Sequence, residues 1–174
     1  GDVPAPLDAK TVEAYCKQMN PKFERFRTHW GVTAKDFIAA QRPANLPPEL
    51  VYPFGGGDLM MALTSFPDAA VLTTMSLELA GDPRRLKTLS DKKSLDQSLK
   101  ALNEAATTTL MSNDSKSVNL SKIQRGDLPG QLSMHLMGLA LHDQEPVSVR
   151  FFKIEDDGSL HYFSRAEIDA LEGA

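Results

Sequence analysis

The sequence predicts an α/β fold, with a small mixed sheet flanked by helices. The segment "LVYPFGGGDLMMALTSFPDAAVLTTMSLEL", residues 50–79, reads as strand, glycine turn, helix and strand, which is one central βαβ unit with parallel strands. The later segment "VSVRFFKIEDDGSLHYF" has two β-rich runs around Asp157 and Gly158, a pair typical of a β-hairpin. We therefore expect an extended arm over residues 1–8, and a single domain over residues 9–174 that ends in a C-terminal hairpin and a helix.

The composition is that of a folded and slightly acidic chain. The 174 residues are 41% hydrophobic and 24% charged, as in ordinary globular domains. The formal net charge of −4 disfavours nucleic acid as a partner, because phosphate binding draws on an excess of Lys and Arg. No run approaches the roughly 18 to 20 apolar residues that a spanning helix needs, so we expect no transmembrane segment.

Near the start, apolar residues recur every three or four positions, which is typical of one helical face: Val12, Tyr15, Cys16, Met19, Phe23, Phe26 and Trp30. Asn20 suits an N-cap and Pro21 a first helical residue, so we expect two helices or one kinked helix, ending at Gly31. The stripe is expected to pack against the sheet. Cys16 is the sole cysteine, so no intrachain disulfide can form, and we expect its thiol to be buried.

The remaining helices follow from periodicity and capping patterns. A short helix is expected over residues 33–41, and Asp58 is a suitable cap for the helix of the βαβ unit. Residues 94–111 carry one apolar face, whereas residues 131–143 are apolar over most of their surface, which indicates a buried helix. The capping box "SRAE" at residues 164–167 opens a terminal helix.

The glycine turn of the βαβ unit is the candidate binding site. Three glycines permit a close approach of a ligand, and the amide groups at the start of the next helix suit an anion. Glu78 closes the predicted second strand, a position at which cofactor-binding folds hold ribose hydroxyls. Arg84 follows, and its guanidinium can bind a carboxylate or a phosphate. The candidate ligand-binding residues are Gly55, Gly56, Gly57, Asp58, Glu78 and Arg84.

A purely structural interpretation of this turn stays open. The spacing does not match G-x-G-x-x-G, and no P-loop lysine follows the glycines. Asp58 would repel a phosphate unless its carboxylate points away or binds a cation. On this interpretation the glycines serve only a tight reversal between strand and helix.

No pattern in the sequence indicates a catalytic or metal site. The histidines are scattered, and His135 and His142 are seven residues apart, two helical turns and too far for joint chelation. No H-E-x-x-H, cysteine pair or G-x-S-x-G is present. We therefore expect no metal, and the sequence leaves the catalytic residues and the cofactor undefined.

A resemblance adds to this interpretation. The stretches "YPFGGGDLMMALTSFPDA", "SLELAGDP" and "LHYFS" resemble a group of uncharacterised bacterial proteins that are expected to be exported. The positions that carry the resemblance are Tyr52, Pro53, Phe54, Gly56, Asp58, Phe66, Pro67, Leu77, Glu78, Tyr162, Phe163 and Ser164. The resemblance implies a periplasmic or extracellular location and no particular substrate.

Two functional hypotheses follow. The first is an exported bacterial binding or interaction protein, with a small-molecule or protein ligand and no catalytic constellation. The alternative is a transferase-like domain that binds a small ligand, a nucleotide or a cofactor of the S-adenosylmethionine type. This alternative uses the glycine turn and Glu78, and it rests on the order of strand, turn, helix and strand alone.

Overall fold

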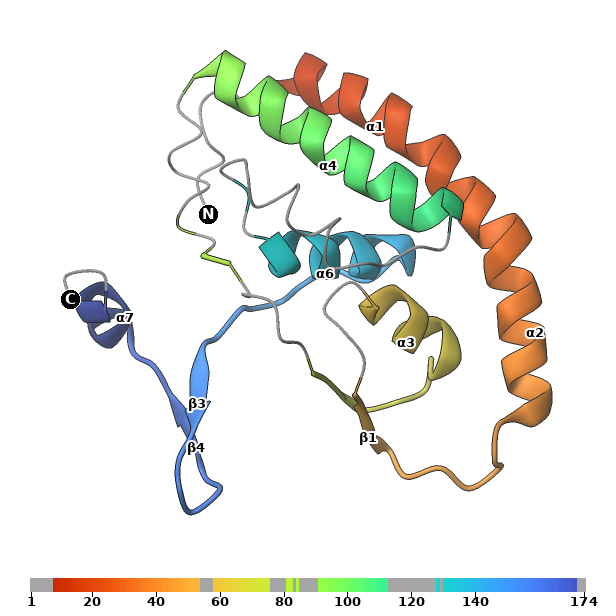
Figure 1. Ribbon diagram of the computed structural model, residues 1–174, viewed down its shortest axis with the longest axis vertical. Helices are drawn as coiled ribbons and strands as arrows, with labels where there is room; N and C mark the ends of the chain where they lie inside the picture. Colours follow the sequence, from red (N-terminus) through yellow and green to blue (C-terminus); the bar gives the residue numbers. More distant parts are fainter. Residues whose placement is uncertain are drawn as a thin grey trace. The chain divides into compact units, whose positions relative to one another are not determined.

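The computed structural model describes residues 8–53, 58–75, 81–82, 84, 91–112, 128 and 130–171. It confirms the α/β class: helices predominate, and the strands form a parallel pair and an antiparallel hairpin (Figure 1). The chain forms two compact units, Gly1–Gln144 and Glu145–Ala174. Each unit is described by itself below.

The first unit begins with a long helical segment that continues past the predicted break. Helix α1 spans Ala9–Arg25 with Pro21 inside it, and its N-cap Asp8 accepts a 2.6 Å hydrogen bond from the Thr11 amide. A π-helical turn, η1 (Phe26–Gly31), leads directly into α2 (Val32–Gln41). The two-helix alternative at Pro21 and the predicted helix end at Gly31 are therefore wrong, and the π-helical turn begins five residues after the proline.

Helix α4 (Lys92–Ser112) lies beside α1 and runs in the same direction (Figure 1). Lys92, at the start of α4, is close enough to the α1 cap Asp8 to lower the pKa of that carboxyl, although the Thr11 hydrogen bonds lower it more. Further along both helices, Asn103 donates to Gln18 at 3.2 Å and accepts from the Lys22 ammonium. A parallel pair of helices requires a long connection, and that connection contains the βαβ unit.

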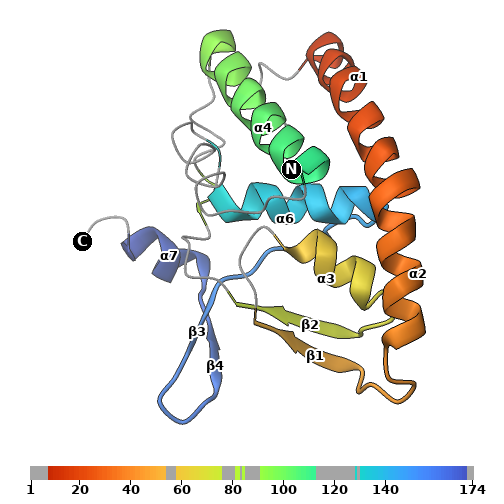
Figure 2. The same ribbon diagram turned by 45° about the vertical axis from the view of Figure 1, so that its right-hand side comes forward.

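The βαβ unit has the predicted order of elements and the predicted parallel direction, but its second strand ends at Thr74, four residues before Glu78. Strands β1 (Glu49–Tyr52) and β2 (Val71–Thr74) pair in parallel, with Leu50 opposite Leu72, and α3 (Leu59–Ser65) lies between them in the chain. Figure 2 shows α3 between this two-stranded sheet and α6 (Gly130–Leu141). One sheet face is half-buried and includes Tyr52, whose ring meets Phe66 edge-on at 6.4 Å.

The core of the first unit is built from helices. Its buried hydrophobic residues come from α1, η1, α3, α4, α6 and residue 128, and among the described residues no strand residue is buried. Tyr15, Phe23 and Trp30 pack against this cluster. The apolar stripe of α1 therefore faces other helices, and the prediction that it covers the sheet is wrong.

One buried polar atom in α4 has no partner. Thr109 is 1% exposed, and no hydrogen bond reaches its hydroxyl from any described residue. An unsatisfied buried hydroxyl costs about 1–3 kcal/mol, while Val and Thr have similar shapes and helix propensities. We expect Thr109→Val to raise the free energy of unfolding by about 1 kcal/mol in a urea titration.

The matched control for this substitution is Thr107→Val on the same helix. Thr107 is exposed, and its hydroxyl donates to the Asn103 carbonyl at 2.7 Å. The control should bring no gain. A decrease in stability for Thr109→Val would show that the hydroxyl has a partner after all.

The second unit contains the predicted hairpin and terminal helix. Strands β3 (Phe152–Ile154) and β4 (Leu160–Tyr162) pair antiparallel, and they do not join the parallel pair in one sheet. Gly158 has a φ of +84°, which the turn requires and which L-residues rarely adopt. The chain then enters α7 (Arg165–Leu171).

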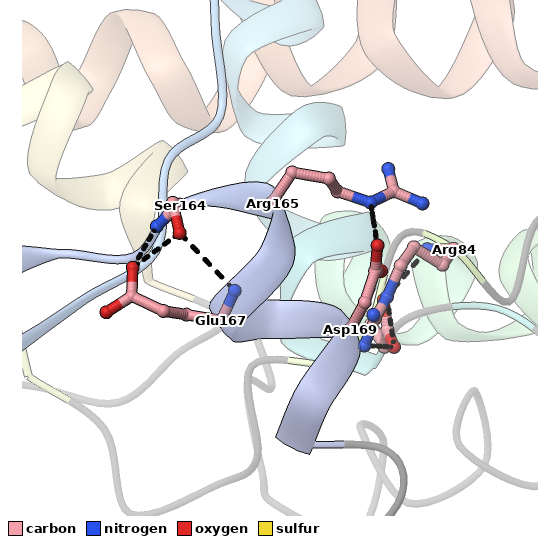
Figure 3. A network of polar contacts seen from close by, with 6 residues as sticks. Arg84, Ser164, Arg165, Glu167 and Asp169 are labelled. Atoms are coloured by element: carbon pink, nitrogen blue, oxygen red, sulfur yellow. Dashed lines mark hydrogen bonds and ion pairs between the residues drawn. The ribbon is translucent and has the colours of Figure 1, made fainter.

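The capping box of α7 has the expected geometry (Figure 3). The Glu167 carboxylate accepts from the Ser164 amide at 2.7 Å and from its hydroxyl at 2.6 Å, and the Glu167 amide donates back to Ser164 Oγ at 3.3 Å. The Ser164 bonds, followed by a hydrogen bond with His161, lower the pKa of Glu167 to about 2. Arg165 pairs with Asp169 one turn on, at 2.9 Å.

Candidate functional site

The structure describes two of the six predicted ligand-binding residues. Gly55, Gly56, Gly57 and Glu78 lie outside the described residues. Asp58 occupies the N-cap position of α3, where its carbonyl oxygen accepts from the Met61 and Ala62 amides, both at 2.9 Å. Its carboxylate makes no capping hydrogen bond to α3, so Asp58 marks the start of the helix without the side-chain bond that the sequence suggests.

Asp58 and Tyr52 lie near each other on either side of the glycine turn. Burial raises the pKa of the Tyr52 phenol, and the negative charge of Asp58 raises it further. Tyr52 ends β1, so the carboxylate lies near the carboxyl end of that strand. This placement agrees with the predicted strand, turn and helix, and it puts an anion where a phosphate was considered.

Arg84 is held by its neighbour Asp82. The Arg84 Nε donates to both carboxylate oxygens at 2.9 Å, Nη2 donates at 2.7 Å, and the Arg84 amide adds a fourth bond at 2.9 Å. A guanidinium in a bidentate ion pair must give up that pair before it binds a ligand carboxylate. This arrangement weighs against Arg84 as the first contact of an anionic ligand.

An apolar groove that the sequence did not predict lies in the described part of the first unit. It has a volume of about 1010 Å³ and lies between α1 and α6, with Leu102 of α4 and Leu128 contributing to its lining. We call it the α1–α6 groove. Its apolar walls include Tyr15, Met19, Phe23, Leu136 and Met137.

The α1–α6 groove exists because α1 carries more apolar surface than one neighbour covers. The inner residue Met19 is 3% exposed, and Tyr15 and Phe23 are half-buried against the core. Burial raises the pKa of the Tyr15 phenol to about 12, with a smaller contribution from Cys16, so Tyr15 is neutral at physiological pH. Cys16 itself is exposed and lines the groove, so the prediction of a buried thiol is wrong.

Arg27 lines the α1–α6 groove and binds the C-terminal end of α6. Its Nε donates to the Leu141 carbonyl at 2.8 Å, and its Nη2 donates to the Ala140 carbonyl at 3.2 Å and to Asp143 Oδ1 at 2.8 Å. Asp143 has a φ of +56°, and the next amide, Gln144, donates to the Leu139 carbonyl at 2.9 Å. The C-terminal carbonyls of α6 are thus satisfied partly by its own turn and partly by a guanidinium from η1.

The groove rim carries two further charges on α1. Lys17 and Glu24 line the groove and are exposed, and neither makes an ion pair with a described residue. Lys17 and Glu24 are seven residues apart, so they lie on the same side of the helix, about 10 Å from each other along its axis. The rim therefore has one positive and one negative position.

The imidazole of His142, at the end of α6, contacts the backbone of α3. Its Nε2 lies 2.9 Å from the Met60 carbonyl, which can only accept, so this nitrogen carries the proton. The Thr64 hydroxyl donates to the same carbonyl at 2.8 Å. Burial lowers the pKa of His142, so the arrangement favours a neutral imidazole that links α6 to α3.

This pKa shift predicts a loss of stability in acid. The imidazole has a lower pKa in the folded chain than in the unfolded chain, so the unfolded chain binds the proton first. The contribution of His142 is present above about pH 6.5 and declines as the pH falls through the lower folded-state pKa. Urea unfolding at pH 8, 7, 6 and 5 should show this decline.

The control variant is His142→Gln, which keeps a donor for the Met60 carbonyl but cannot titrate. Its free energy of unfolding should therefore fall less between pH 7 and pH 5 than that of the natural protein. An equal fall in both proteins would contradict the assignment.

No catalytic or metal-binding arrangement is found among the residues that the structure describes. Their His, Cys, Asp and Glu side chains form no cluster of three or more that could hold a metal ion. Two hydroxyls lie near an imidazole: Thr28 is 2.9 Å from His29, and Thr64 is 3.3 Å from His142. Each hydroxyl donates to a backbone carbonyl, Thr28 to that of Glu24 and Thr64 to that of Met60. This geometry is that of a structural link.

The sequence contains a partial signal for the α1–α6 groove. The segment 131–143 is apolar on most sides, which indicates that more than one face of this helix meets apolar surface. The periodicity of the α1 stripe gives the other wall. The sequence alone does not show that the two helices meet, because more than a hundred residues separate them.

Comparisons with known proteins leave the chain without a family. No family profile matches it, and neither a curated protein nor a solved structure is significantly similar to it. The resemblance to exported bacterial proteins therefore stays a prediction. Within the described residues, no helix is both long and apolar enough to cross a bilayer.

Proposed function

We propose that this chain is an exported bacterial binding protein that holds the apolar part of a ligand in the α1–α6 groove. The observation that carries the proposal is the groove itself, whose volume of about 1010 Å³ is at the upper end of ordinary ligand pockets. Apolar walls with a few polar groups at the rim are typical of such pockets. The exported location rests on the sequence resemblance alone.

A non-catalytic role agrees with the groove lining. Arg27 and Asp143 are already paired with each other, and the Tyr15 phenol stays protonated at physiological pH. The groove is thus suited to holding a ligand.

Binding of a neutral apolar dye, N-phenyl-1-naphthylamine, tests this function. Leu136 is half-buried and lines the groove, and a carboxylate at this position would have to be desolvated beside any apolar ligand. We expect Leu136→Glu to weaken dye binding by at least about tenfold, equivalent to about 1.4 kcal/mol. Phe37→Glu is the control, because Phe37 is a large exposed apolar residue (67%) on α2, outside the groove.

The exposed thiol provides a second readout. Cys16 is the sole cysteine and lines the groove, so alkylation by a maleimide reports on one place. Bound dye should slow the alkylation in the natural protein but not in Leu136→Glu. Equal dye affinity in the two Glu variants, together with unprotected Cys16, would refute the proposed function.

The cofactor-binding alternative keeps one supporting observation. The parallel pairing of β1 and β2 puts the carboxyl ends of both strands, Tyr52 and Thr74, at the same end of the sheet. Ligands of open α/β sheets bind at that end. If this alternative holds, S-adenosylmethionine or a nucleotide should raise the melting temperature, and both Gly56→Val and Glu78→Ala should abolish the rise. No rise with any of these compounds would remove the alternative.

A further inference from the structure

The α1–α6 groove has the dimensions of a seat for a helix. Its lining residues on α1 run from Tyr15 to Glu24, a length of about 14 Å, and those on α6 run from Ser133 to Ala140, about 11 Å. Two turns of an α-helix are about 11 Å long. Two helices can therefore form the walls of a site in which a third helix buries its apolar face.

The charges on the rim distinguish a helix from a smaller amphiphile. Lys17 and Glu24 have opposite charges, are exposed, and make no ion pair with a described residue. A single-chain amphiphile has one charged head group and would complement only one of the two positions. A helix has charged side chains along both edges of its apolar face, so it can place an acid near Lys17 and a base near Glu24.

We infer that the α1–α6 groove binds an amphipathic helix of a partner protein, with an acidic residue near Lys17 and a basic residue about two turns away, near Glu24. This inference rests on the proposed function, because it names the class of ligand that the same groove receives. The two rim charges also fix the direction of the bound helix relative to α1. A helix with the same apolar face and the opposite order of charges is the wrong partner.

The experiment uses the full chain and a synthetic amphipathic peptide of about 14 residues, roughly four helical turns. The peptide has leucines on one face and, on the adjoining edge, one Glu and one Arg about two turns apart. Fluorescence anisotropy of the labelled peptide gives its affinity. We expect Lys17→Glu and Glu24→Lys each to weaken binding about threefold to tenfold, and a peptide with Glu and Arg exchanged to bind the double variant better than it binds the natural chain.

Matched controls separate local pairing from net charge. Lys10→Glu and Glu13→Lys make the same charge changes at exposed positions of α1 that do not line the groove. They should leave the affinity within about twofold, a difference of about 0.4 kcal/mol. If they weaken binding as much as the rim variants do, only the net charge matters and the inference is wrong.

The outcomes separate the inference from the proposed function. If the naphthylamine dye or dodecanoate binds in a Leu136-dependent manner and the peptide does not, the groove takes a small amphiphile and the helix inference is overturned. Peptide binding that is insensitive to both rim reversals, or a charge-exchanged peptide that fails to recover affinity in the double variant, also overturns it. If neither dye, dodecanoate nor peptide binds, the proposed function fails as well.

Discussion

Replacing Gly138 with valine is expected to lower the free energy of unfolding by about 2–3 kcal/mol. Gly138 lies on the face of α6 that meets α3, and a Cβ built on it would be 3.2 Å from the Met60 backbone nitrogen. That contact is tighter than nine in ten real Cβ contacts, and its partner is backbone, which cannot rotate away. The two γ-carbons of valine would push the helices apart, and Met60, which is 3% exposed, would lose packing.

Two further variants show whether the effect comes from crowding. Gly138→Ala gains up to about 1 kcal/mol in helix propensity, but its Cβ requires the Met60 backbone to move by a few tenths of an ångström. Because the two effects oppose each other, the free energy of unfolding should stay within about 1 kcal/mol of that of the natural protein. Ala40→Val introduces valine at an exposed position of α2, where only propensity changes. Urea titrations in which Gly138→Val matches Ala40→Val would contradict the close approach of α3 and α6.

Replacing Arg27 with alanine is expected to cost about 2 kcal/mol of stability. The guanidinium is the side-chain donor to two C-terminal carbonyls of α6, and the bond to Leu141 is partly buried. Without it, the Leu141 carbonyl must find water at the end of the α1–α6 groove or stay unsatisfied. We also expect this variant to bind apolar dye more weakly, because Arg27 lines the groove and holds the end of α6 in place.

The fork shape of the guanidinium should matter more than its charge. Arg27→Lys keeps the cation but reaches fewer acceptors, so its stability should lie between those of the natural protein and the alanine variant. Asp143→Asn removes the ion pair, whose carboxylate is 83% exposed, and keeps a residue type that tolerates the positive φ. Its loss should stay below about 1 kcal/mol. A loss from Asp143→Asn as large as that from Arg27→Ala would assign the stabilisation to the ion pair and not to the helix cap.

The parts of the fold that the sequence predicted correctly are local. The β-strands around α3, the Gly158 turn and the Ser164 capping box each depend on residues within a short stretch, and their chemistry is readable there. Pro21 shows the limit of local rules. A proline disfavours a helix interior, yet Met19 and Phe23 on either side are packed into the core, and this packing keeps the helix continuous.

In the candidate site, too, the features that depend on a short stretch of sequence could be predicted, and those that depend on tertiary packing could not. Asp58 and Tyr52 are close in sequence, and their proximity across the turn follows from the strand and helix that flank it. The α1–α6 groove could not be predicted in this way, because Arg27 and Leu141 are brought together only by the complete first unit. Cys16 was predicted to be buried from its place in an apolar stripe, but its side chain is exposed.

The bond between Arg27 and the end of α6 has a consequence for synthesis on the ribosome. Arg27 leaves the exit tunnel 114 residues before its acceptor Leu141 does. During that interval α1 and α4 can pair, but the apolar side of α1 that later faces α6 stays open to other molecules. A nascent chain that stalls before residue 141 would therefore attract chaperones at this surface, and completion of α6 would release them.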